Sequence, residues 1–172
     1  MVFDYYNRLS AKKQSVYRQS DALTAIRLPD PQTLRPAAQS LVAALKSEDR
    51  NTVQSLSQQI ADGIIAQLKV PPLRIQVLAV RPSDDWGELH GLYLPEEDGK
   101  PAKIQLWMRT AKHKRVVAYK SFLRTLLHEL CHHLDYELYK FPETFHTEGF
   151  YSRESSLLHQ LVPATDGPRK AD

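Results

Sequence analysis

The periodicity of hydrophobic positions changes twice along the chain, and the first stretch is helical. Residues 3–23 carry apolar and aromatic side chains without strand alternation, and residues 37–45 form a second, shorter helical stretch. A third stretch spaces its apolar residues three and four positions apart, as one buried helix face requires: Val53, Leu56, Ile60, Ile64 and Leu68. Pro71 and Pro72 end this pattern, so residues 1–70 are predicted to form an N-terminal helical extension.

The middle of the chain alternates hydrophobic and polar residues as strands do. Residues 73–80, 86–94 and 103–109 predict three strands. Between the second and the third lies Glu-Glu-Asp-Gly-Lys-Pro, residues 96–101, a run of turn-forming residues. The second and third strands are therefore expected to pair as an antiparallel hairpin.

Helical periodicity returns over residues 116–139 and ends at Pro142. A loop then leads to a last helix over residues 152–161, and the tail 163–172 is expected to fray. Helices, a small mixed sheet with a hairpin, and helices again predict an α+β single domain, whose main body spans residues 71–162.

The composition suits a soluble globular protein and says little about function. Of 172 residues, 42% are hydrophobic and 25% charged. No apolar run approaches the roughly 18–20 residues that span a bilayer, and the N-terminus lacks the pattern of a secretory signal. The single cysteine, Cys131, cannot form an internal disulfide, so a cytoplasmic location is expected. With a net charge of +3, the basic cluster at residues 112–115 makes nucleic-acid binding possible but unsupported. The oligomeric state is not determined.

The strongest chemical signal is the run His128-Glu129-Leu130-Cys131-His132 in the helix predicted over residues 116–139. At about 100° per residue, the two histidines fall on one helix face, opposite a face of leucines. Two histidines four positions apart can bind one zinc ion together. Glu129, beside them, is placed to take a proton from a zinc-bound water. Asp135, one turn further on, is predicted to hold the free N–H of a liganding histidine.

A catalytic zinc ion needs a third protein ligand and an open fourth position. The loop after the helix can return a side chain to the metal, and His146 is the preferred third ligand. Glu154, on the last predicted helix, is the main competitor, and Glu148 and Glu143 are further alternatives.

Residues 125–134 resemble the extended signature of the zincin metallopeptidases at all ten positions. Among zincins, His-Glu-Leu-Cys-His followed by 13 residues and then His146, with Phe150 four residues later, resembles the SprT-like metalloproteases. That family's third ligand lies in a His-Gly-x-x-Phe element, whereas this chain has His-Thr-Glu-Gly-Phe. The resemblance implies a zincin-like domain that hydrolyses peptide bonds. His128, His132 and His146 would bind Zn²⁺, and Glu129 would act as general base and acid. The single cysteine excludes the four-cysteine zinc ribbon that such proteins often add, so their DNA-linked role is not implied.

Other functions remain open on the sequence alone. These are a zinc-binding regulatory or interaction module with little turnover, hydrolysis of a non-peptide amide, and a gluzincin-type peptidase with Glu154 as third ligand. For a peptidase, residues 103–109 are the expected edge strand that pairs with the substrate, or else an ordinary strand without substrate contact. Tyr151 or Arg153 are candidates to stabilise an oxyanion. Cys131 is expected to fill the core, and His133 to be partly exposed.

Overall fold

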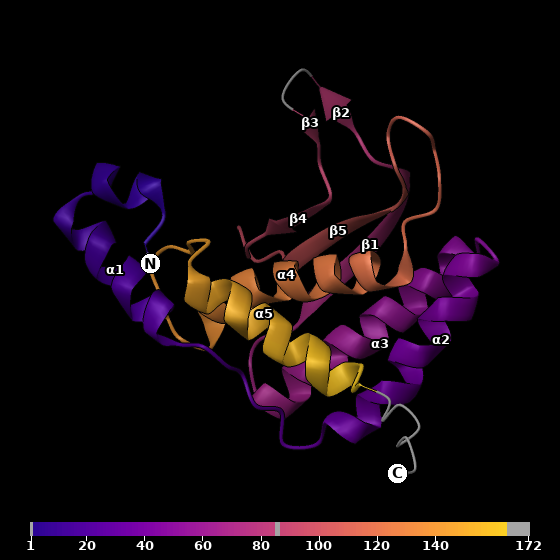
Figure 1. Ribbon diagram of the computed structural model, residues 1–172. Helices are drawn as coiled ribbons and strands as arrows, with labels where there is room; N and C mark the ends of the chain where they lie inside the picture. Colours follow the sequence, from indigo (N-terminus) through magenta and orange to yellow (C-terminus); the bar gives the residue numbers. More distant parts are fainter. Residues whose placement is uncertain (1, 85–86, 165–172) are drawn as a thin grey trace, which may run out of the picture.

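The protein is described here from a computed structural model, for residues 2–84 and 87–164. Its fold is α+β: a three-stranded mixed sheet lies against α-helices that cover its apolar face (Figure 1). The elements along the chain are η1 (Asp4–Arg8), α1 (Ala11–Ala22), η2 (Pro31–Leu34), α2 (Arg35–Lys46), α3 (Arg50–Leu68), β1 (Leu73–Val80), β2 (Ser83–Asp84), β3 (Gly87–Glu88), β4 (Gly91–Leu94), β5 (Ala102–Arg109), α4 (Tyr119–Glu137) and α5 (Glu148–Leu161).

The predicted helices are present, with boundaries that local capping explains. The first is divided, because a 3-10 helix ends at Arg8 and the Ser10 side chain then caps α1. The last begins at Glu148, four residues before the predicted start, because the Thr147 hydroxyl accepts a hydrogen bond from the Phe150 N–H at 2.9 Å. α3 ends where Lys69 adopts a left-handed conformation with φ of 56°.

The sheet has the strand order β1-β5-β4, and the hairpin prediction is confirmed because β4 and β5 pair antiparallel. The prediction that residues 103–109 form the edge strand is wrong. β5 is the central strand, since β1 pairs with its other side in parallel, and β4 is at the edge. Of the strand predicted over residues 86–94, only Gly91–Leu94 joins this sheet, while β3 pairs with β2. Residues 85–86 lie outside the described residues.

One hydrophobic core joins the N-terminal helices to the rest of the fold. Leu41 of α2 and Ile60 of α3 are fully buried in the same cluster as Val77 of β1 and Leu127 of α4. The helical extension therefore shares its core with the sheet. The tail prediction falls almost wholly outside the described residues, which end at residue 164. No helix in the described part of the chain is long and apolar enough to span a membrane.

Side chains of α3 close one edge of the sheet. Gln58 accepts a hydrogen bond from the Ile75 N–H at 2.8 Å and donates one to the Leu73 carbonyl at 3.1 Å. Gln54 accepts from the Val77 N–H at 3.0 Å. These amides take the place of a neighbouring strand along β1, so a further strand cannot pair there.

Candidate metal centre

α4 buries one side against the core and turns two histidines toward α5. Leu123, Leu127 and Leu130 are fully buried. Cys131, also fully buried, is core filler as predicted. His133 was expected to be partly exposed, but it is 1% exposed. Its ring is buried because both nitrogens have partners: Nε2 lies 2.8 Å from the Pro71 carbonyl, and Nδ1 lies 2.9 Å from the Tyr93 hydroxyl.

The tertiary structure brings His128, His132 and His146 together. His146 Nε2 lies 3.1 Å from His128 Nε2 and 3.0 Å from His132 Nε2. One ligand nitrogen from each ring lies within 4.8 Å of the other two. His146 comes from the loop between α4 and α5, which Thr147 ends by capping α5.

The Nδ1 atoms of His128 and His132 have partners that determine where their protons lie. The Glu154 carboxylate lies 2.8 Å from His128 Nδ1, and a carboxylate only accepts, so Nδ1 donates. The Thr144 hydroxyl lies 2.8 Å from His132 Nδ1 and donates its own proton to Asp135 at 2.7 Å, so this Nδ1 also donates. Asp135 therefore supports His132 through Thr144, and not by the direct contact that was predicted.

The donor set fits a metal ion. With Nδ1 protonated, His128 and His132 each direct an Nε2 lone pair toward the Nε2 of His146. Ligand bonds of about 2.0–2.1 Å at tetrahedral angles separate neighbouring nitrogens by about 3.3 Å, close to the two distances observed. Burial, and then the neighbouring His128 and His146, lower the pKa of His132 to about 3, which keeps this ring neutral. Three imidazole nitrogens this close together could hold one divalent transition-metal ion.

The three glutamates that were alternative ligands lie away from this point. Glu154 binds the Nδ1 edge of His128, and its second oxygen accepts from Arg124 at 2.9 Å. Glu143 pairs with Lys13 at 3.1 Å. Glu148 is the first residue of α5, and it is not among the described residues whose ligand atoms gather at the cluster. Glu154 is thus a buried hydrogen-bond partner of a cluster histidine. Sequence spacing alone could not distinguish this role from that of a metal ligand.

Glu129 lies beside the histidines under the edge strand β4. Its side chain is 7% exposed. Burial raises its pKa to about 7, against the opposing effects of His128 and of a hydrogen bond from the Tyr93 backbone N–H. β4 approaches so closely because residue 91 is glycine: a Cβ there would lie 2.8 Å from Glu129 Oε1 and 2.7 Å from Thr125 Cγ2.

Replacing Gly91 by Ala is expected to displace Glu129 and lower any activity that depends on it at least about tenfold, since about 1 Å of misplacement can cost more. Overpacking of this kind also costs about 1–3 kcal/mol of stability. Kinetics with metal analysis and thermal unfolding measure both effects.

Gly99→Ala is the control for Gly91→Ala. Gly99 has a φ of 75°, so the alanine strains the turn, but nothing lies within 4 Å of the added Cβ. It should lower stability and spare activity. Equal activity losses in the two variants would contradict the role of Gly91.

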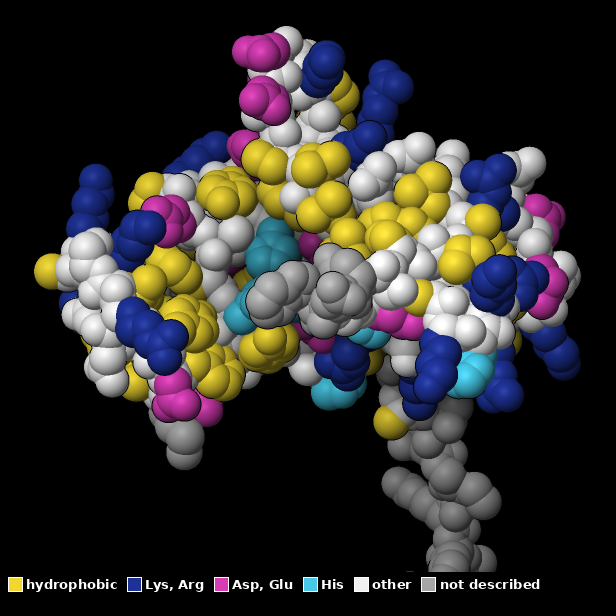
Figure 2. Space-filling view, turned by 90° about the horizontal axis from the view of Figure 1, so that it is seen from above, with side chains coloured by type: hydrophobic (Ala, Val, Ile, Leu, Met, Phe, Trp, Pro, Cys, Tyr) yellow, Lys and Arg dark blue, Asp and Glu magenta, His cyan; other side chains and the backbone are white. Residues whose placement is uncertain are grey.

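A cavity of about 710 Å³ opens beside the cluster. β4 lines one side, the start of α4 another, and Tyr151 of α5 a third. Figure 2 looks onto this face, where histidines lie near the centre beside hydrophobic side chains. Tyr151 is 42% exposed, and its ring centroid lies 5.8 Å from that of His146. The alternative oxyanion residue, Arg153, is fully buried and donates to Asp135 at 2.9 Å, so that prediction is wrong.

Sequence patterns did not indicate Tyr93, Thr144 or Gly91 as parts of the site. They reach it from β4 and from the loop before α5, and only pairing of the sheet and packing of that loop place them there. Comparisons with protein families, curated proteins and solved structures found no match for this chain.

Proposed function

We propose that the protein is a zinc-dependent metallopeptidase. The observation that carries the proposal is the convergence of three histidine Nε2 atoms beside a buried glutamate, at the wall of an open cavity. Three neutral nitrogen ligands with space next to them are typical of catalytic zinc sites, whereas structural zinc sites are closed by four protein ligands. Glu129 has no role in a purely structural site, which favours an enzyme over a binding module.

In this proposal His128, His132 and His146 bind the metal, and Glu129 moves the protons. A bound zinc ion polarises the scissile carbonyl and makes water easier to deprotonate. The Glu129 carboxylate accepts the proton of the attacking water and then donates it to the leaving amine. Tyr151 is exposed at the cavity wall, and in this proposal it donates a hydrogen bond to the oxyanion.

The two edges of the sheet favour a peptide as substrate. The edge at β1 is closed by α3 side chains, and the edge at β4 borders the cavity. In an antiparallel pair, alternate residues turn their peptide groups away from the partner strand. The Tyr93 N–H reaches Glu129, so Gly91, two residues earlier, also turns its N–H and C=O toward the cavity. An extended peptide can pair there, with a scissile bond beside Glu129.

After zinc reconstitution, the purified protein is expected to hold about one zinc ion per chain, because it has one cluster of three histidines among the described residues. It should cleave an unfolded protein such as casein, lose this activity with 1,10-phenanthroline and regain it with zinc. Elemental analysis and a gel-based cleavage assay measure the two outcomes. Absence of bound zinc in the reconstituted protein would contradict the proposal.

A matched pair of peptides tests the substrate class. A peptide cleaved by the protein is compared with the same peptide N-methylated at one backbone amide near the cleavage site. The methylated form should be cleaved at least about tenfold more slowly, because it loses a hydrogen bond to the edge strand. Equal rates for the two peptides, or faster hydrolysis of a small non-peptide amide, would argue against strand pairing.

A further inference from the structure

The N-terminal segment, residues 3–23, contacts the second half of the loop that carries His146. The loop, residues 138–147, contains no helix or strand. Its contacts with η1 and α1 continue into the start of α5, and they pair Lys13 with Glu143 (3.1 Å), Tyr17 with Phe145 (ring centroids 6.1 Å apart), Tyr5 with His146, Ser20 with Thr147 (3.4 Å) and Asp21 with Gly149 (3.0 Å). The conformation of this loop therefore depends on a segment more than 100 residues away in sequence.

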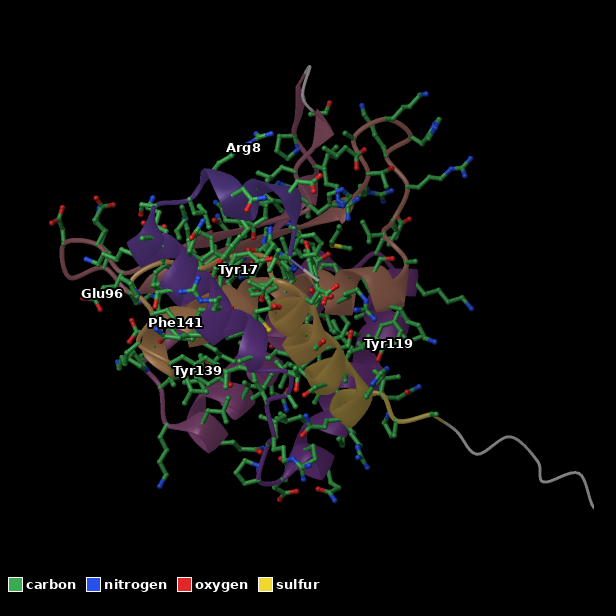
Figure 3. The ribbon with its side chains drawn as sticks, turned by 60° about the vertical axis from the view of Figure 1, so that its left-hand side comes forward. Arg8, Tyr17, Glu96, Tyr119, Tyr139 and Phe141 are labelled. Carbon is green, nitrogen blue, oxygen red and sulfur yellow. The ribbon has the colours of Figure 1, made fainter. Side chains whose placement is uncertain are left out.

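Tyr5 makes the contact nearest to the cluster. Its hydroxyl donates a hydrogen bond to the His146 backbone carbonyl at 2.7 Å. Its ring packs edge-on against Tyr17, with centroids 5.7 Å apart, and Tyr17 is fully buried. Figure 3 looks onto α1, the helix that carries Tyr17. The hydroxyl is thus held at the backbone of His146 by a side chain that is itself fixed in the core.

The end of α1 is joined to the same site from a second direction. A Cβ on Gly149 would lie 2.4 Å from the Asp21 carbonyl oxygen, so α1 sits directly on the first turn of α5. Arg153 donates to the Ser20 carbonyl at 2.6 Å and to Asp135 at 2.9 Å. Asp135 in turn accepts from Thr144, the partner of His132.

We propose that residues 3–23 are a positioning element of the metal site, and that Tyr5 is the positioning residue for His146. This inference rests on the proposed metal site. His128 and His132 are fixed by their helix, whereas His146 is an exposed loop residue whose backbone Tyr5 holds. Loss of this hydrogen bond lets the loop sample conformations in which the third imidazole is turned away. The apparent affinity for zinc then falls in proportion to the fraction of molecules in which the complete site is present.

Tyr5→Phe tests the inference, with Tyr6→Phe as the matched control. Tyr6 lies in the same 3-10 helix, and its hydroxyl accepts a hydrogen bond from Arg18 in an exposed position. Tyr6→Phe therefore removes the same group from the same element without touching the His146 backbone. Zinc affinity is measured by competition with a chromophoric chelator. Tyr5→Phe is expected to lower it about tenfold, the lower end of losses seen for residues that hold metal ligands. Tyr6→Phe should stay within about twofold of the wild type.

A double variant separates positioning from general stability. If Tyr5 acts through His146, adding Tyr5→Phe to His146→Ala should not weaken zinc binding further. The absorption spectrum of the Co²⁺-substituted protein gives a second reading, because a change in coordination number alters it. Unchanged zinc affinity and Co²⁺ spectrum in Tyr5→Phe would overturn the inference, as would an equal loss in the His146→Ala background. Failure of the wild type to bind zinc would instead overturn the proposed function.

Discussion

Glu129→Gln is expected to abolish peptide hydrolysis while the protein retains its zinc. The amide has nearly the same shape as the carboxylate, but it cannot accept a proton from water. Loss of a general base typically lowers kcat by about 10²–10⁴-fold. The histidine Nε2 atoms that would bind the ion face one another and not residue 129. The substitution therefore leaves the ligand set intact.

The measurement is kcat on a cleaved peptide, with the zinc content of the same preparation. Thermal unfolding is the control for folding. Glu129 is buried with a pKa raised to about 7, so the neutral amide should be tolerated without loss of stability at neutral pH. A raised carboxyl pKa means that the fold stabilises the neutral form of the side chain relative to the charged form. Turnover near the wild-type rate would remove Glu129 from its proposed role.

His146→Ala is expected to weaken zinc binding by several orders of magnitude, and Glu154→Gln by about two orders at most. His146 contributes one of three converging nitrogens. Two histidines on one helix would then bind the ion alone, with water in the vacated position. Glu154 contacts His128 on the opposite ring edge from the cluster. Substitution of such a partner typically costs about 10–100-fold in metal affinity.

Gln is the sharper replacement at position 154 because the side chain is buried between Arg124 and His128. Its amide oxygen can still accept from His128, whereas Ala would leave that N–H without a partner. Both variants are titrated with zinc against the same chelator, with circular dichroism to check folding. Should Glu154→Gln lose the metal while His146→Ala retains it, a gluzincin-type arrangement with Glu154 as ligand would replace the proposed site.

Features that depend on local periodicity could be predicted from the amino-acid pattern alone. The spacing of apolar residues predicted the helices, and alternation with a turn between predicted the β4–β5 hairpin. The pairing of His128 with His132 follows from the geometry of any helix, since residues four apart share a face. Cys131 could be placed in the core because it lies next to the leucine face.

Features that depend on which elements become neighbours could not be predicted from local patterns and became clear only in the folded chain. β5 became central because β1, from earlier in the chain, pairs with its far side, and no local pattern encodes that choice. His133 is buried because Tyr93 and Pro71, from other elements, satisfy its ring. Arg153 is buried because it donates hydrogen bonds to the Ser20 carbonyl at the end of α1 and to Asp135 of α4.

The same distinction applies to the third histidine and its supports. Sequence spacing made His146 a candidate, but a loop residue can point in many directions. Its position depends on Thr147, which starts α5, and on Tyr5, which binds its backbone from the opposite end of the chain. Glu154 was a rival ligand in the sequence because distance along a chain does not specify which edge of an imidazole a carboxylate will meet. Packing of α5 against α4 decides this, because it brings Glu154 to Nδ1 and leaves Nε2 facing the cluster.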